Sequence, residues 1–206
     1  TFNVLRPDEA VELLRENRLP PRALIITFDD GYADNVEIAM PILQRHGMAA
    51  VFFIASDFLD GGVMWNDRIS FALRAAPVGT LSLAACDIGI DSVDLTDAAR
   101  RSAAFEKVIA ATKYLPPVRR QAVVDTLVEL SGVTLPRDLM MTTAQLKALQ
   151  AGGMVIGGHT CSHPILSSLD DAEAEREIIA NKARLEAILD TRLTLFAYPN
   201  GGPGKD

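Results

Sequence analysis

Short apolar runs and amphipathic stretches alternate along the first third of the chain. Residues 24–28 and 49–55 are continuous runs of β-prone residues, the pattern of strands buried on both faces. Between them, apolar residues recur at helical spacing over residues 34–46. A short helix is also predicted over residues 8–18. The succession of strand, helix and strand is typical of a parallel sheet covered by helices.

The stretch from about residue 57 to residue 141 breaks this alternation. It contains a predicted hairpin (residues 80–84 with 88–95), a helix over residues 97–115 and a further helix that ends near Gly132. We interpret the stretch as a mainly helical insertion packed beside the main sheet.

The alternation of helices and strands resumes at Thr142. A helix capped by Thr143 is predicted to run through Gln150, and a strand follows over residues 154–157. A long amphipathic helix is predicted over residues 170–190. Its predicted inward positions are Ile178, Ile179, Leu185 and Leu189, and the next strand is predicted over residues 193–198. The chain as a whole is therefore predicted to have an α/β fold.

Composition narrows the class of protein. The chain has 206 residues, of which 49% are hydrophobic, and this suits a single globular domain. Its net charge is −7 and it has no basic cluster, so nucleic acid is a poor candidate partner. No apolar run approaches the roughly 20 residues that a transmembrane segment needs. Cys86 and Cys161 are too few and too far apart for a disulfide framework.

Two adjacent carboxylates, Asp29 and Asp30, directly follow the first predicted buried strand. Such carboxylates repel each other and are costly to desolvate, and a bound cation is the simplest compensation. One carboxylate could then ligate the cation while the other acts on a water molecule bound to it. The alternative is a turn in which one of the two aspartates caps the following helix.

His159 and His163 lie in one predicted loop. Glycines precede this loop and Pro164 ends it, so the backbone can turn both imidazoles toward one point. Neutral imidazole is the commonest biological metal ligand, which predicts a metal site here. The alternative interpretation is a pair of solvent-exposed loop histidines. The remaining histidine, His46, lies at a predicted helix C-terminus, where a capping or dipole role is expected.

Three segments together resemble the polysaccharide deacetylase domain, also called the NodB-homology domain of carbohydrate esterase family 4. The family's TFDDG motif is matched by residues 27–31, and its H-[ST]-x-x-H-P motif is matched by residues 159–164. The third motif of the family is matched in part by residues 196–201. The order of the motifs and the intervening pattern agree over most of the chain outside the insertion.

The resemblance implies a deformed (β/α) barrel, which has seven strands in the family and is expected to be incomplete in this chain. It implies that Asp30, His159 and His163 bind a divalent metal, commonly zinc and sometimes cobalt or nickel. Asp29 would be the general base that activates a water molecule. The residues that would line the substrate groove are Tyr198, Pro199 and Asn200.

The implied activity is hydrolysis of acetyl groups on a polysaccharide or oligosaccharide. N-deacetylation of N-acetylglucosamine residues in a bacterial glycan is the leading form. Ester hydrolysis on an O-acetylated sugar such as xylan is the alternative, because the same site could attack either carbonyl. Localisation in the cell envelope or secretion is favoured over the cytoplasm.

Two departures from the family pattern bear on turnover. Ala197 stands where the family carries an arginine that positions the base, and no spare histidine can serve as the general acid. The chain begins at Thr1 and ends at Asp206, directly after a predicted strand, so we expect the natural protein to continue and to supply that acid. Because of these departures, a glycan-binding domain without catalytic activity is an alternative function. A purely structural role for the aspartates and histidines is a third alternative.

Overall fold

The computed structural model describes residues 2–200, and the chain divides into two compact units. The first unit contains Thr1–Gly62 and Arg137–Asp206, and the second contains Val63–Pro136. The second unit lies within the segment interpreted as an insertion. The organisation of the chain as one domain interrupted by that insertion stays a prediction.

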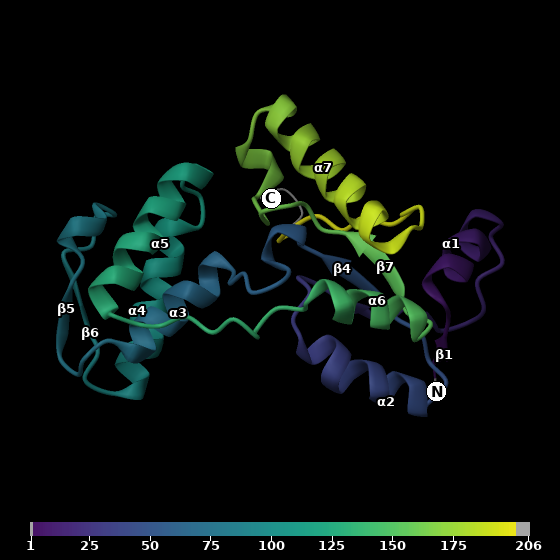
Figure 1. The fold of residues 1–206 in the computed structure, drawn as a ribbon, viewed down its shortest axis with the longest axis horizontal. Helices are drawn as coiled ribbons and strands as arrows, with labels where there is room; N and C mark the ends of the chain where they lie inside the picture. The colour runs from purple at the N-terminus through teal and green to yellow at the C-terminus, as the bar shows by residue number, and fades with distance from the viewer. Residues whose placement is uncertain (1, 201–206) are drawn as a thin grey trace. The chain divides into compact units, whose positions relative to one another are not determined.

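A parallel sheet forms the centre of the first unit (Figure 1). Its strands in spatial order are β3 (Thr27–Phe28), β4 (Val51–Ile54) and β7 (Val155–Gly158). A single parallel bridge adds Phe196 beside Gly158. A separate parallel pair consists of β1 (Asn3–Val4) and β2 (Ala23–Leu24). Over residues 2–200 these strands do not close into a ring, as an incomplete, deformed barrel requires.

The first unit also contains several helices and short helical turns. They are α1 (Pro7–Arg15), the π-helix η1 (Asn35–Ala39), α2 (Met40–Arg45), α6 (Thr143–Ala151), α7 (Asp171–Leu189) and the short 3-10 turns η2 (Ser56–Phe58) and η4 (Leu166–Ser168). Phe52, Ile54 and Ile156 of the sheet share one core with Leu43, Leu146 and Leu185 of the helices. Because η1 contacts α6 and α6 contacts α7, these helices pack as neighbours around the strands (Figure 1).

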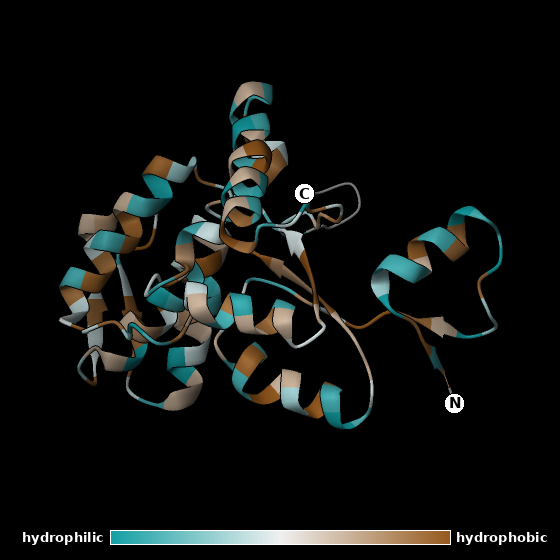
Figure 2. Cartoon of the chain, turned by 45° about the vertical axis from the view of Figure 1, so that its right-hand side comes forward, coloured by the Kyte–Doolittle hydropathy of each residue, from teal (hydrophilic) through white to brown (hydrophobic). Residues whose placement is uncertain are grey.

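The hydropathy pattern explains this packing. Figure 2 shows apolar residues along the strands of the sheet and alternating apolar and polar bands along the helices. A helix with such bands buries one stripe and leaves the other in water. Among the described helices, none is both long enough and apolar enough to span a bilayer.

The second unit is mainly helical, as predicted for the insertion. It contains α3 (Trp65–Ala75), β5 (Thr80–Ser82), the 3-10 turn η3 (Ala84–Cys86), β6 (Ser92–Asp94), α4 (Ala98–Thr112) and α5 (Pro117–Ser131). Strands β5 and β6 form the expected antiparallel hairpin. Asp97 caps α4, and Gly132 ends α5 in a left-handed conformation. Ile69, Leu83 and Val124 belong to the separate core of this unit.

The apolar run over residues 24–28 is not one strand buried on both faces. Its start belongs to β2, which pairs with β1, and its end belongs to β3, which pairs with β4. Leu24 and Ile25 remain 40% and 38% exposed. The apolar character of a run of residues does not predict that its two ends pair with different strands. It also does not predict how much of the run the rest of the protein buries.

The strand predicted over residues 193–198 is reduced to one bridge. Leu193 donates its N–H to the side chain of Glu186, at a distance of 2.8 Å, instead of pairing with β7. Gly158 N–H donates to Leu195, and Ala197 N–H donates to Gly158, each at 3.0 Å. The sheet therefore holds this segment only around Phe196.

Two details of the later helices also differ from the sequence prediction. Thr142, not Thr143, caps α6, because its hydroxyl accepts the N–H of Gln145 in a capping box. In α7, Ile179 is 57% exposed, whereas Asn181 is fully buried. A polar residue thus occupies an inward position where apolar residues were expected.

Candidate metal centre

A tight turn presents Asp30 immediately after β3. Gly31 N–H donates to the carbonyl oxygen of Asp29 at 2.9 Å, so Asp30 is the central residue of a three-residue turn. Its φ is +75°, a conformation that side chains other than those of Asn and Asp rarely adopt. The N–H of Ala55, just after β4, donates to the Asp30 carbonyl at 3.1 Å and fixes this turn to the sheet.

His159 follows directly after β7, and its side chain is buried. Its Nδ1 lies 2.9 Å from the carbonyl oxygen of Ala197. A carbonyl oxygen can only accept, so Nδ1 carries the hydrogen and Nε2 carries the lone pair in the neutral ring. That Nε2 lies 3.4 Å from Asp30 Oδ1.

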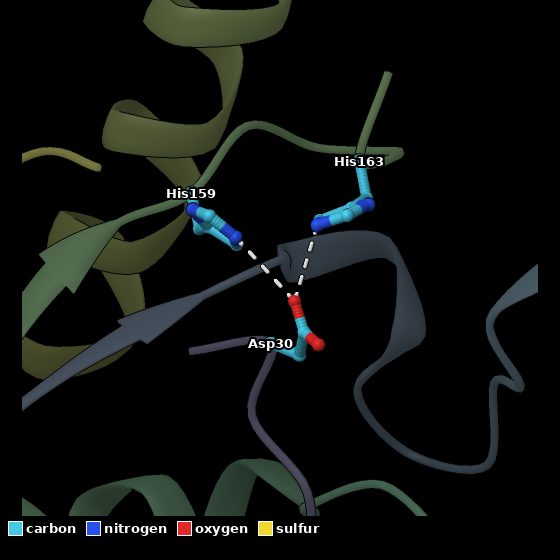
Figure 3. Close-up of side chains that lie close together, drawn as sticks. All are labelled: Asp30, His159 and His163. Atoms are coloured by element: carbon cyan, nitrogen blue, oxygen red, sulfur yellow. Dashed lines mark ion pairs between the residues drawn. The ribbon is translucent and has the colours of Figure 1, made fainter. Parts of the chain in front are cut away.

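His163 comes from the same loop and approaches the same oxygen. Its Nε2 lies 3.2 Å from Asp30 Oδ1. The loop folds back through Thr160 and His163, whose φ values are +64° and +55°. Thr160 Oγ1 accepts the N–H of His163 at 3.1 Å. Figure 3 shows both imidazoles pointing toward one oxygen of Asp30.

The three side chains form a group that could hold a metal ion, because their ligand atoms all lie within 4.8 Å of one another. Asp30 Oδ1 is buried and has no geometrically complete hydrogen bond. In the tautomer set by Ala197, the lone pair of His159 would face this carboxylate and repel it. A cation between them satisfies both groups, so the residues fit a metal.

The electrostatics of the site favour an ionised Asp30. Burial alone would raise the pKa of its carboxyl, but the His159 and His163 imidazoles beside it hold that pKa well below its usual range. A carboxylate that stays charged is the form that ligates a metal.

The other predicted site residues lie outside this group. The Asp29 side chain is exposed. Tyr198 is 67% exposed and packs edge-on against Phe196, with ring centroids 5.3 Å apart. Pro199 is buried and Asn200 is exposed. The roles predicted for these four residues stay predictions, and Gly201 of the third motif lies outside the described residues.

Sequence reasoning missed the group that orients His159. This group is the backbone carbonyl of Ala197, and a backbone atom leaves no trace in a side-chain motif. The available signal was the position of Ala197 on the strand predicted over residues 193–198. Such outer partners fix the tautomer and direction of a ligand imidazole.

Comparison with known sequences assigns the family. The polysaccharide deacetylase family model matches residues 16–113 and 118–206, which is most of the chain. The Bacillus subtilis (strain 168) protein YxkH, which is named after the polysaccharide deacetylases, is 41% identical over 54 residues. That match covers 26% of this chain and 19% of YxkH.

Comparison with solved structures gives the fold. The Streptococcus pyogenes deacetylase PplD, solved in complex with acetate, has a TM-score of 0.55 at 18% identity, and the match covers 98% of this chain and 57% of PplD. IcaB from Ammonifex degensii has a TM-score of 0.56 at 18% identity, with 98% and 60% covered. The BpsB deacetylase domain from Bordetella bronchiseptica has a TM-score of 0.54 at 18% identity, with 99% and 66% covered. The chain therefore has the deformed α/β barrel fold of these proteins and spans about three fifths of their length.

Proposed function

This chain belongs to the polysaccharide deacetylase family, and on that premise we propose that it is a metal-dependent hydrolase that removes acetyl groups from a glycan. The observation that carries the proposal is the meeting of ligand atoms from Asp30, His159 and His163 within 4.8 Å of one another. Its most specific form is N-deacetylation of N-acetylglucosamine residues in a bacterial polysaccharide.

Zinc is the proposed ion, with cobalt and nickel as alternatives. Two imidazole nitrogens and one carboxylate oxygen suit zinc, and three protein ligands leave its fourth position open. When bound, the ion supplies polarisation of the acetyl carbonyl and a lower pKa for the attacking water.

Proton abstraction from the water and stabilisation of the oxyanion are assigned to the chain's own residues, and the acid that protonates the leaving amine is not among them. Asp29 accepts a proton from the attacking water, and its exposed side chain is open to water and substrate. The backbone N–H near Tyr198 donates to the oxyanion that forms on the acetyl group. Tyr198, Pro199 and Asn200 line the groove, in which the exposed ring of Tyr198 is available to contact a sugar.

One observation favours a second candidate, a glycan-binding domain without catalysis. Ala197 occupies the place of the family's base-positioning arginine, and its methyl group carries no charge to orient Asp29. Such a domain would retain the metal ligands and the groove. It would bind acetylated glycan and release no acetate.

The test measures acetate release by zinc-loaded protein from N-acetylglucosamine oligomers and from acetylated xylan. We expect release from the first substrate, loss of activity after chelation, and recovery on adding zinc. Release from xylan alone would establish the esterase instead. Stoichiometric zinc with glycan binding but no acetate from either substrate would establish the glycan-binding domain. Protein that takes up no divalent metal would overturn the proposal.

A further inference from the structure

We infer that Asn181 and Glu177 of α7 are positioning residues, which hold the loop carrying both histidines in the shape that brings their Nε2 atoms together. The inference rests on the proposed function, because it concerns the same site. The two residues are four positions apart and therefore share one face of the helix. That face meets the loop that follows β7.

Asn181 ties together the ends of two neighbouring strands. Its side chain is fully buried. Its Oδ1 accepts the N–H of His159 at 3.2 Å, and its Nδ2 donates to the carbonyls of Ile54 at 3.0 Å and Thr160 at 2.5 Å. Both amide hydrogens and the oxygen are thus used, each by a backbone group of Ile54, Thr160 or the predicted ligand His159.

The sequence makes room for this contact at Gly158. A Cβ atom on Gly158 would lie 2.7 Å from Asn181 Oδ1, closer than the two atoms can approach. The last residue of β7 is therefore a glycine because the amide of Asn181 occupies the space a side chain would need. This pairing links α7 to the strand end from which His159 projects.

Glu177 holds the middle of the loop. Its Oε2 accepts the N–H groups of Cys161 at 2.7 Å and Ser162 at 2.9 Å. Its Oε1 accepts the hydroxyl of Ser162 at 2.6 Å. These three bonds fall on the two residues that separate the second ligand from Thr160.

The loop needs such support because its backbone is strained. Thr160 and His163 both have positive φ, and neither is a glycine. Conformations of this kind persist only where surrounding contacts fix them. Without the bonds from Asn181 and Glu177, relaxation of the loop would move the His163 imidazole away from Asp30 while the helix and sheet stayed folded.

The experiment compares zinc affinity, measured by competition with a chromophoric chelator, with thermal unfolding of the same proteins. Glu177→Ala and Asn181→Leu are expected to weaken zinc binding by roughly 10- to 100-fold. The side chain of Glu177→Gln keeps an oxygen that can accept the two backbone N–H groups. Its amide N–H can donate to the oxygen of the Ser162 hydroxyl. The zinc affinity of this variant should therefore stay near that of the wild type. Glu175→Ala is the matched control, because Glu175 is exposed on the same helix.

A second readout is independent of metal. Amide hydrogen exchange at Cys161 and Ser162 in metal-free Glu177→Ala should be faster than in the wild type, while exchange in β4 is unchanged. If Asn181→Leu does not fold, the Glu177 variants carry the test. Folded Glu177→Ala with wild-type zinc affinity and wild-type exchange would refute the positioning role. A wild-type protein that binds no zinc would instead refute the proposed function, whatever the exchange shows.

Discussion

His159 Nδ1 lies 2.9 Å from the carbonyl oxygen of Ala197. This contact joins the metal-ligand loop to the segment that the family resemblance assigns to the substrate groove. It also fixes which ring nitrogen of His159 is available to a metal, because the one facing a carbonyl must carry the hydrogen. The residue that lacks the family's arginine side chain thus contributes to the site through its backbone.

Removal of a ligand should abolish metal binding. We expect Asp30→Asn, His159→Ala and His163→Ala each to lose stoichiometric zinc, because two ligands hold the ion too weakly to survive dialysis. Elemental analysis of the dialysed proteins is the measurement. His46→Ala is the control, since His46 is the exposed C-cap residue of α2. Full zinc occupancy in all three ligand variants would show that the ion binds elsewhere.

Asp29→Asn separates catalysis from metal binding. The amide cannot accept a proton, so kcat should fall about 10²-fold or more, while zinc content stays at the wild-type level. Steady-state acetate release and elemental analysis on one preparation give both values. If kcat is unchanged, another group is the base.

Ala197→Arg tests the departure from the family pattern. Ala197 is only half-buried. A guanidinium that orients Asp29 should raise kcat/KM by roughly tenfold, which corresponds to about 1.4 kcal/mol of barrier. Ala197→Gln, which has similar length and no charge, is the matched comparison. An equal effect of both substitutions would exclude a role for the charge.

Asp60 stabilises the start of α6 through its charge. Its carboxylate accepts the hydroxyl of Thr143 at 2.6 Å and the N–H of Thr143 at 2.8 Å, and these bonds lower the pKa of the Asp60 carboxyl. A lowered pKa in the folded state means that the stabilisation is present above roughly pH 4 and is lost as the pH falls through the folded-state pKa.

We therefore expect Asp60→Asn to lower the free energy of unfolding by about 0.5 kcal/mol at pH 7 and by less at pH 3, since the group is exposed and screened. Asparagine is the suitable replacement because Asp60 has a φ of +62°, which asparagine tolerates. Urea unfolding at the two pH values measures the difference. A deficit that is the same at both would assign the effect to geometry and not to charge.

The sequence motifs, together with the family resemblance, predicted the convergence of the candidate ligands. Asp30 follows one strand of the parallel sheet and His159 follows another, and the carboxyl ends of parallel strands meet at one edge. The glycines before His159 and Pro164 after His163 excluded a helix. The family resemblance implied that Asp30 and the two histidines, which lie far from it in the sequence, share one site, and the structure brings their ligand atoms together.

The parts that could not be predicted depend on long-range partners. Hydrophobic periodicity predicted an inward Ile179 in α7, yet Asn181 is the buried residue because backbone groups of β4 and of the loop after β7 satisfy its amide. The strand expected over residues 193–198 failed for a related reason. Its first residue bonds to Glu186 of α7, which strand propensity does not encode.

The end of β4 is shared by both halves of the site. Ala55 N–H binds the carbonyl of Asp30, and the carbonyl of Ile54 accepts the N–H of His159 at 3.2 Å. Neither segment can slide along β4 without breaking a hydrogen bond to it. The site therefore cannot be enlarged for a bigger ion by moving one ligand segment alone. The register of β4 would have to be redesigned, and both segments would move with it.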